Sequence, residues 1–224
     1  MGIDVLHICD LGVTQDLIGN VLWEFISGGF VTGRTISDRV KQTALRLKAH
    51  YKALQTPVRI DALSAEMIRR EGKGPKLRAK GAETKNALPF AMELALEMAA
   101  AKPTTHYKSV AAACSALMDF YVLLDNDEWL PDAASVACRR FCVLFAALSQ
   151  EADDSRYWKL KPKVHLFQEL VEFQSHHLGH PAKYWTYQDE SFVGMVAKLA
   201  FSRGGPRNVA SAAQRTLDRY RALQ

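Results

Sequence analysis

Basic side chains cluster in one short stretch of the 224-residue chain. Residues 69–80 hold a single acidic residue, Glu71, and six basic ones: Arg69, Arg70, Lys73, Lys76, Arg78 and Lys80. The stretch therefore carries a net charge of +5, which equals that of the whole chain, so the other 212 residues balance to zero. Lys and Arg side chains neutralise backbone phosphates independently of base sequence and in a salt-sensitive way. We expect residues 69–80 to contact a DNA backbone; the alternatives are a solvated loop and a loop that binds an acidic protein surface.

A carboxylate and an imidazole, Asp4 and His7, stand three residues apart near the start of the chain. Such a pair can position a catalytic segment or touch a metal site, because both side chains are metal ligands and proton carriers. The alternative is a polar pair at the edge of a sheet. A zinc site is a further hypothesis, since His176 and His180 would share a helix face, but these histidines lack the flanking ligands of a structural zinc module.

The composition is that of an ordinary globular protein, with 48% hydrophobic and 24% charged residues. It excludes wholesale disorder and collagen-like structure. The four cysteines are too few and too irregularly spaced for a disulfide framework, so we expect reduced, buried thiols. The first residues do not resemble a signal peptide, and no stretch approaches about 18 consecutive apolar residues. We therefore expect a soluble, intracellular, mildly basic protein with no membrane partner.

Helical periodicity dominates the chain and predicts a mainly α fold, a helical bundle with at most one or two short edge strands. The strand candidates are residues 3–9 and 58–62. Ser37 or Asp38 is expected to cap the second helix, Pro89 to kink or restart the fourth, and residues 72–81 to form an exposed loop. The expected helices cover residues 14–26, 38–54, 64–71, 82–101, 105–124, 131–149, 164–177, 189–202 and 206–222.

The acidic stretch 151–154 is the most linker-like segment of the chain. Two regions are therefore predicted, 1–150 and 151–224. The first contains the Asp4 and His7 pair and the basic loop, and the second is a C-terminal helical region.

Four segments follow one another in the order of a known enzyme family. The first has Asp4 and His7 in an Asp-x-x-His pattern and continues through residues 16–22; the second, residues 77–83, precedes a Leu-Pro step at Leu88 and Pro89. The third, residues 161–165, contains a Pro-Lys-x-His element, and the fourth, residues 184–190, is rich in aromatic residues and ends in Glu190. Together they resemble the C-terminal part of a CACTA or Plavaka/KDZ-type DDE DNA transposase. One departure is Glu169, which stands where the family often has a second His.

The resemblance implies an RNase H-like nuclease core interrupted by a helical insertion, here residues 12–183. In this family three carboxylates, Asp, Asp and Glu, hold Mg²⁺ ions that activate the attacking oxygen and stabilise the leaving oxygen. Glu190 would be the third carboxylate and metal ligand, with Asp4 and His7 beside the catalytic site. The alternative for Glu190 is a solvated acid in the first turn of a helix. The first two Asp residues belong upstream of Asp4, where this sequence has three residues, so we expect the chain to be catalytically incomplete.

Two functions from different classes follow from these observations. The first is a transposase-derived DNA-binding protein that contacts the phosphate backbone through residues 69–80 and is nuclear if the resemblance holds. The second is a non-enzymatic all-α interaction module that forms a homo-oligomer through the apolar helices of residues 104–149.

Overall fold

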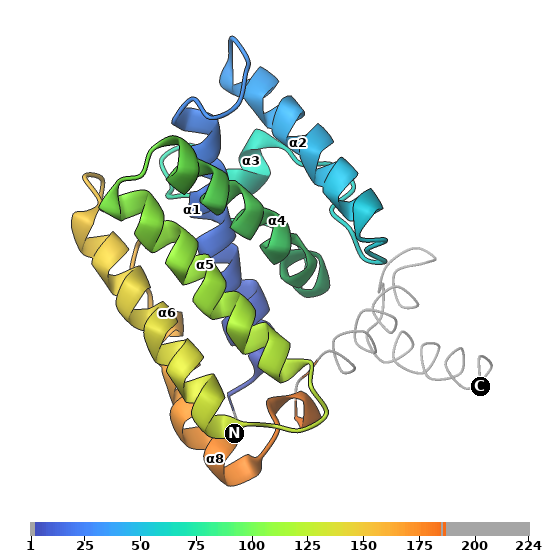
Figure 1. Cartoon of the computed structure of the whole chain (residues 1–224), viewed down its shortest axis with the longest axis vertical. Helices are drawn as coiled ribbons and strands as arrows, with labels where there is room; N and C mark the ends of the chain where they lie inside the picture. Colours follow the sequence, from blue (N-terminus) through green and yellow to red (C-terminus); the bar gives the residue numbers. More distant parts are fainter. Residues whose placement is uncertain (1–2, 185, 187–224) are drawn as a thin grey trace, which may run out of the picture. The chain divides into compact units, whose positions relative to one another are not determined.

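The computed structural model describes residues 3–184 and 186 (Figure 1). Its regular structure is helical throughout, and the described residues form no strand, so the mainly α prediction is confirmed. The chain divides into a compact unit, 1–184, and a remainder, 185–224. The segment expected to be a linker, 151–154, lies within the first unit. The helices expected at 189–202 and 206–222 lie outside the described residues.

Three long helices form one layer of the bundle. In Figure 1, α5 (Thr105–Leu124) lies between α4 (Gly81–Ala101) and α6 (Pro131–Glu151). Against α4 pack α1 (Gln15–Ser27) and the π-helical segment η1 (Leu6–Thr14), and α7 (Pro162–Glu169) packs on η1 and α6. Aromatic rings fill the interior; for example, Phe120 meets Phe167 edge to face with ring centroids 4.8 Å apart.

The remaining helices are shorter or peripheral. α2 (Ile36–Ala53) packs on α1, α4 and the single turn α3 (Ala65–Ile68). After α7 the chain continues through η2 (Leu170–Gln174), α8 (Ser175–Leu178) and η3 (Pro181–Lys183).

Local capping chemistry sets the starts of several helices. Thr104 accepts a hydrogen bond from the Tyr107 amide at the start of α5, and Pro131 occupies the first turn of α6, so both helices begin at the predicted residues, 105 and 131. The predicted start of α2 is too late: Thr35 is its N-cap, and Asp38 completes a reciprocal capping box with it. Asp38 therefore caps from the third helical position, because its carboxylate accepts the Thr35 amide.

Neither strand candidate forms a strand. Residues 3–9 lead into η1, where the Asp4 carboxylate accepts the His7 amide at 2.9 Å and so starts a helix. Val5, Leu6, Ile8 and Cys9 are all buried, and a short, mostly apolar run cannot be assigned to a helix or a strand by its periodicity alone. Residues 58–62 are irregular and connect α2 to α3.

Of the two outcomes expected at Pro89, a kink or a restart of the helix, the restart is wrong, because α4 runs without interruption from Gly81 to Ala101. Leu88 and Phe90 on either side of the proline are buried in the core. Tertiary packing therefore outweighs the loss of one backbone hydrogen bond.

α5 is long and apolar enough, by length and composition, to cross a membrane, with a mean hydropathy of 1.3 over 18 residues. Half of that window is buried inside the protein, and a core helix of a soluble protein passes the same test. The helix is explained here by its position between α4 and α6.

A carboxylate–imidazole pair joins the start of α5 to α1. Glu24 accepts a hydrogen bond from His106 at 2.9 Å and raises the pKa of the imidazole. The pair therefore stabilises the fold fully below the unfolded pKa of about 6.5 and loses this contribution as pH rises through the higher folded pKa. We expect the free energy of unfolding to fall by about 0.2–1 kcal/mol through that window, the range for a partly exposed pair. Urea titrations of the wild type and His106→Gln at several pH values test this; an equal fall in the variant would contradict it.

Candidate nucleic-acid interface

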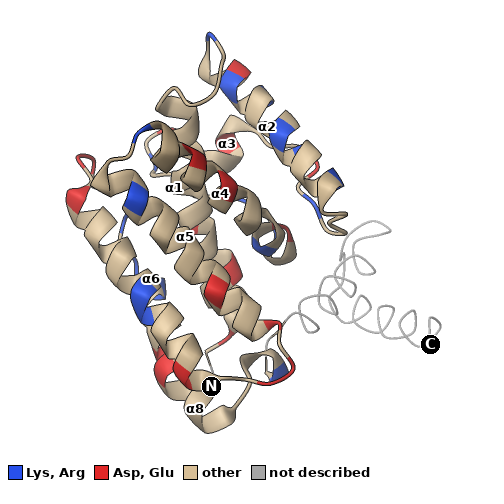
Figure 2. Ribbon diagram, viewed as in Figure 1, with Lys and Arg blue, Asp and Glu red and all other residues tan. Residues whose placement is uncertain are grey.

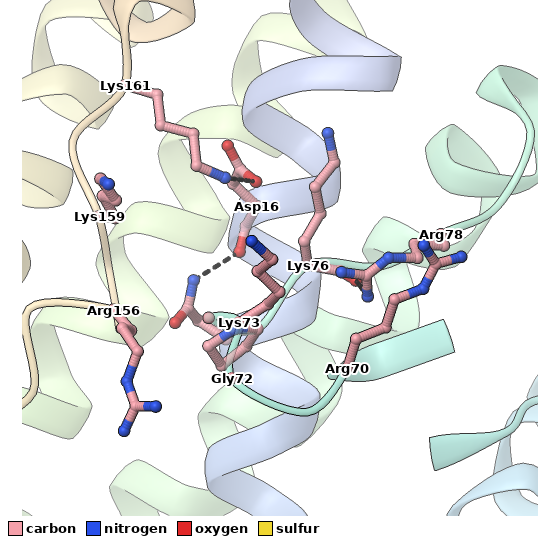
Figure 3. Close-up of a pocket in the computed structure, with 12 residues that line it drawn as sticks. Asp16, Arg70, Gly72, Lys73, Lys76, Arg78, Arg156, Lys159 and Lys161 are labelled. Carbon is pink, nitrogen blue, oxygen red and sulfur yellow. Dashed lines mark hydrogen bonds and ion pairs between the residues drawn. The ribbon is translucent and has the colours of Figure 1, made fainter. Parts of the chain in front are cut away.

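A basic pocket of about 480 Å³ lies on one side of α1 (Figure 3). Seven of its lining side chains are cationic: Arg70, Lys73, Lys76, Arg78, Arg156, Lys159 and Lys161. One carboxylate, Asp16, also lines it, together with Asn20 and the glycine-rich turn 72–75. The cations come from two segments about 80 residues apart in sequence, which α1 holds side by side.

The first wall is the basic loop, and backbone hydrogen bonds hold it against α1 and α3. The Leu77 amide donates to the Gln15 carbonyl at 2.9 Å, and the Lys76 and Arg78 amides donate to carbonyls of α3, both at 2.8 Å. Pro75 and Leu77 are buried. The expected exposed loop is therefore correct only at residues 72, 73 and 80, because Pro75 and Leu77 anchor the part between them in the core.

A glycine on α1 allows this close approach. A Cβ atom at Gly19 would lie 2.4 Å from the Cα atom of Lys76, which is closer than real Cβ atoms come. Gly74 makes the equivalent approach to the second wall, where a Cβ atom would lie 2.0 Å from the Arg156 carbonyl oxygen. Residues 72–78 thus fit between α1 and the second wall only with glycine at these two positions.

The second wall, residues 156–161, is fixed by Trp158 and Lys161. Trp158 is 1% exposed, adopts a left-handed backbone conformation (φ 46°), and donates its amide to the Asn20 side chain at 2.9 Å. Its indole N–H donates to Glu24. Lys161 forms an ion pair with the buried Asp16 at 2.6 Å. These contacts to α1 bring Arg156, Lys159 and Lys161 to the pocket.

Four of the six cations predicted to bind DNA, namely Arg70, Lys73, Lys76 and Arg78, line the pocket. Lys80 lies outside it, is exposed, and approaches Glu83 to 3.7 Å at the start of α4. Sequence reasoning missed Arg156, Lys159 and Lys161. Their only sequence signal is a basic pattern just after an acidic stretch, and nothing in it indicates proximity to residues 70–78.

Arg69 has a different role from its neighbours. Its guanidinium lies between the rings of Trp23 and Tyr157, 4.7 and 5.1 Å from their centroids, and donates to the Lys73 carbonyl. This stack joins α1, the basic loop and the second wall.

We therefore expect Arg69→Gln to lower the free energy of unfolding by about 1 kcal/mol, the scale of cation–π contacts. The salt dependence of DNA binding should remain that of the wild type, because Arg69 is engaged within the protein. Chemical denaturation and a binding series in salt measure the two effects; a shallower salt slope with unchanged stability would assign Arg69 to DNA instead.

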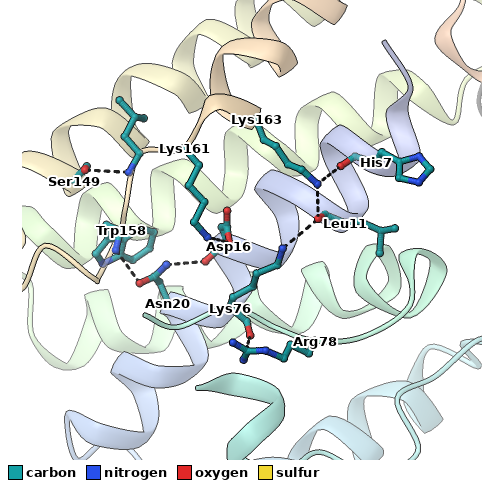
Figure 4. Close-up of polar contacts among 11 residues, drawn as sticks. His7, Leu11, Asp16, Asn20, Lys76, Arg78, Ser149, Trp158, Lys161 and Lys163 are labelled. Carbon is teal, nitrogen blue, oxygen red and sulfur yellow. Dashed lines mark hydrogen bonds and ion pairs between the residues drawn. The ribbon is translucent and has the colours of Figure 1, made fainter. Parts of the chain in front are cut away.

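Lysine ammonium groups also hold backbone carbonyls near Gly12, where η1 departs from helical geometry (Figure 4). Lys163 donates to the carbonyls of His7 and Leu11 at 2.6 and 3.0 Å, and Lys76 donates to Leu11 at 3.3 Å. Burial lowers the pKa of Lys76, the Asp16 carboxylate opposes this shift, and neighbouring cations add to it. Burial and the charge of Arg70 lower the pKa of Arg78. Positive charge in the pocket is thus crowded and partly desolvated.

Among the described residues, carboxylates neutralise only two of the seven cations. Lys161 pairs with Asp16, and Arg156 forms a bidentate pair with Asp154. Lys76 and Arg78 donate only to carbonyl oxygens, which carry no net charge. In the same part of the chain, Arg70, Lys73 and Lys159 make no hydrogen bond or ion pair through their charged groups. Five positive charges therefore face the pocket without a countercharge from residues 3–184.

The residues predicted to be catalytic do not join this pocket. Asp4 Oδ2 lies 2.6 Å from His7 Nδ1 in a local pair on the first turn of η1, so the pair stands on a helix and not at the edge of a sheet. Glu190 lies outside the described residues. Within the part of the chain that the structure describes, no three His, Cys, Asp or Glu side chains are grouped to hold a metal ion. Binding of Mg²⁺ remains a prediction of the resemblance.

The histidines considered for zinc have other partners. His176 lies 3.2 Å from the Ser135 hydroxyl, and His180 lies 2.9 Å from the Asn126 carbonyl. Cys138 and Cys142 share a face of α6 with their sulfur atoms 4.0 Å apart. The four cysteines are free thiols, and all except the half-buried Cys142 are buried.

A second basic surface lies on the outer face of α2, where Figure 2 shows several basic positions. Lys41, Lys48 and Lys52 are exposed and have no ion-pair partner in the described part of the chain, whereas Arg46 pairs with Glu97 at 2.6 Å. None of the three lysines lines the basic pocket. Substitution of these three lysines would therefore remove three positive charges outside the pocket, which makes them a control for variants of the pocket cations.

The segments that carry the transposase resemblance meet beside the pocket. Two lysines of the third segment contact the first: Lys163 donates to the carbonyl of His7, and Lys161 pairs with Asp16. Leu77, at the start of the second segment, bonds to Gln15. The fourth segment lies almost wholly outside the described residues.

Comparisons with protein-family models, with curated proteins and with solved structures find no match to this chain.

Proposed function

We propose that the chain binds DNA by contacting backbone phosphates at the basic pocket. The observation that carries this proposal is the convergence of residues 70–78 and 156–161 on one pocket, where five positive charges lack a countercharge from the described residues. The phosphates of a DNA backbone carry negative charge at regular intervals, and they can supply the countercharge that these cations lack. The cations lie on a backbone fixed by glycine contacts and by Trp158, so the site is formed before any ligand binds.

We also propose that the chain derives from a transposase of the CACTA or Plavaka/KDZ type. The order of the four resembling segments along the chain supports this, and three of them are in contact within the fold. DNA binding is then the part of the ancestral transposase activity that the chain retains, and the chain acts inside the cell, in the nucleus. Catalysis would need the two Asp residues that the resemblance places upstream of Asp4.

An interaction module remains the second candidate, and one observation favours it. Val136 and Val143, seven residues apart on one face of α6, are 65% and 68% exposed. Most other apolar residues of α5 and α6 are buried within the chain, so an oligomer interface on these helices would be small.

Fluorescence anisotropy of a labelled 20-base-pair duplex, titrated with the full chain over a salt series, tests the proposal. We expect log affinity to fall linearly with log salt, by about 0.9 for each phosphate contacted. A chain that shows no affinity for the duplex at 50 mM salt, yet forms a stable oligomer by light scattering, would contradict DNA binding and support the interaction module.

A further inference from the structure

The shape of the basic pocket restricts how a nucleic acid can occupy it. A volume of about 480 Å³ is within the range of pockets for small ligands. A DNA duplex is wider than such a pocket and would contact only its rim. A single phosphate group with its sugar, in contrast, is small enough to enter.

The charge of the pocket favours one kind of phosphate over another. A phosphodiester within a strand carries one negative charge, whereas a phosphomonoester at a strand end carries about −1.5 to −2 at pH 7 and offers three acceptor oxygens. Arg70, Lys73 and Lys159 are the cations without partners among the described residues, and they come from both walls. A dianionic phosphomonoester compensates more of this positive charge than a monoanionic phosphodiester does, and it needs no contacts outside the pocket to do so.

Lys161, on the second wall, adds no uncompensated charge, because Asp16 neutralises it. Charge-assisted hydrogen bonds to a phosphate would therefore come from Arg70 and Lys73 on the first wall and Lys159 on the second, and a terminal phosphate that projects between the walls would reach donors on both sides. A phosphate inside a strand has nucleotides on both sides, and these would have to enter the pocket with it.

We propose that the basic pocket binds the terminal phosphomonoester of a DNA strand. This inference rests on the proposed function, since it specifies which part of DNA the pocket takes. The phosphate lies between Lys73 on one wall and Lys159 on the other, and the adjoining duplex extends over the rim.

Two duplexes of identical sequence, one with 5′-phosphates and one with 5′-hydroxyls, provide the test when binding of each to the full chain is measured by anisotropy at 100 mM salt. We expect the phosphorylated duplex to bind about tenfold more tightly. In Lys73→Gln/Lys159→Gln the two duplexes should bind nearly equally, whereas Lys41→Gln/Lys48→Gln should keep the tenfold preference. Circular dichroism checks that each variant keeps its helix content.

The outcomes separate this inference from the proposed function. Equal, salt-sensitive binding of the two duplexes to the wild type would overturn the terminal-phosphate site and leave DNA binding intact. No binding of either duplex at low salt would overturn both. Thymidine 5′-monophosphate is the probe for the other source of the same chemistry. If it binds as tightly as the phosphorylated duplex, the pocket is a site for free small phosphates and the inference fails.

Discussion

Replacing Arg70, Lys73 and Lys159 together by glutamine is expected to lower affinity for duplex DNA by about 10²–10³-fold at 100 mM salt. These are the pocket cations without a partner in the described structure, so the substitutions remove charge without breaking an internal hydrogen bond or ion pair. The slope of log affinity against log salt should become shallower by about 0.9 for each phosphate that the variant no longer neutralises. Anisotropy titrations at four or more salt concentrations measure both quantities.

The matched control removes the same charge from the second basic surface. Lys41→Gln/Lys48→Gln/Lys52→Gln lowers the net charge by three but leaves the pocket unchanged. We expect its affinity to stay within about threefold of the wild type, because exposed charges beyond about 10 Å are largely screened at this salt concentration. Equal losses of affinity in the two triple variants would show that binding follows net charge and not the pocket.

Trp158→Ala should have the largest effect on stability, a loss of about 3–5 kcal/mol in the free energy of unfolding. The indole is buried, packs against Phe145 with ring centroids 5.6 Å apart, and donates a hydrogen bond to Glu24. Its removal would leave a large cavity between α6 and α1 and release the second wall of the pocket. Urea denaturation followed by circular dichroism measures the change.

Leu160→Ala is the control for that variant, because Leu160 lies two residues away and is exposed. We expect a change within about 0.5 kcal/mol. Trp158→Phe keeps most of the ring packing but cannot donate to Glu24, so it should fall between the two. A destabilisation of less than about 1 kcal/mol in Trp158→Ala would contradict the role of this residue as the anchor of residues 156–161.

The helical class could be predicted from sequence because the signals are local. Thr104 and Pro131 mark helix starts through their own side chains. After Thr14, apolar residues recur three and four residues apart, which is the spacing of one face of a helix and predicts α1. The helical segment η1, at the start of the chain, was not predicted and was expected to be a strand. Its apolar residues Leu6, Ile8 and Cys9 are buried, and periodicity alone does not distinguish a helix from a strand in a short, mostly apolar run.

Only one wall of the candidate site could be predicted from the sequence. The charge excess at residues 69–80 is visible in the sequence, but the partnership with residues 156–161 depends on tertiary contacts through Asn20 and Asp16. Arg69 is the opposite case, a residue that the sequence assigns to the site and the structure does not. It belongs to the same basic run by sequence, yet Trp23 and Tyr157 engage its guanidinium within the fold.

The most direct measurement of where DNA binds uses the unmodified protein. Brief acetylation of surface lysines with acetic anhydride, with and without a saturating duplex at low salt, is read residue by residue by mass spectrometry. The pocket account predicts that DNA protects Lys73 and Lys159 several-fold, while Lys41, Lys48 and Lys52 on α2 react equally in both samples. Protection of the α2 lysines with unchanged reactivity of Lys73 and Lys159 would contradict it.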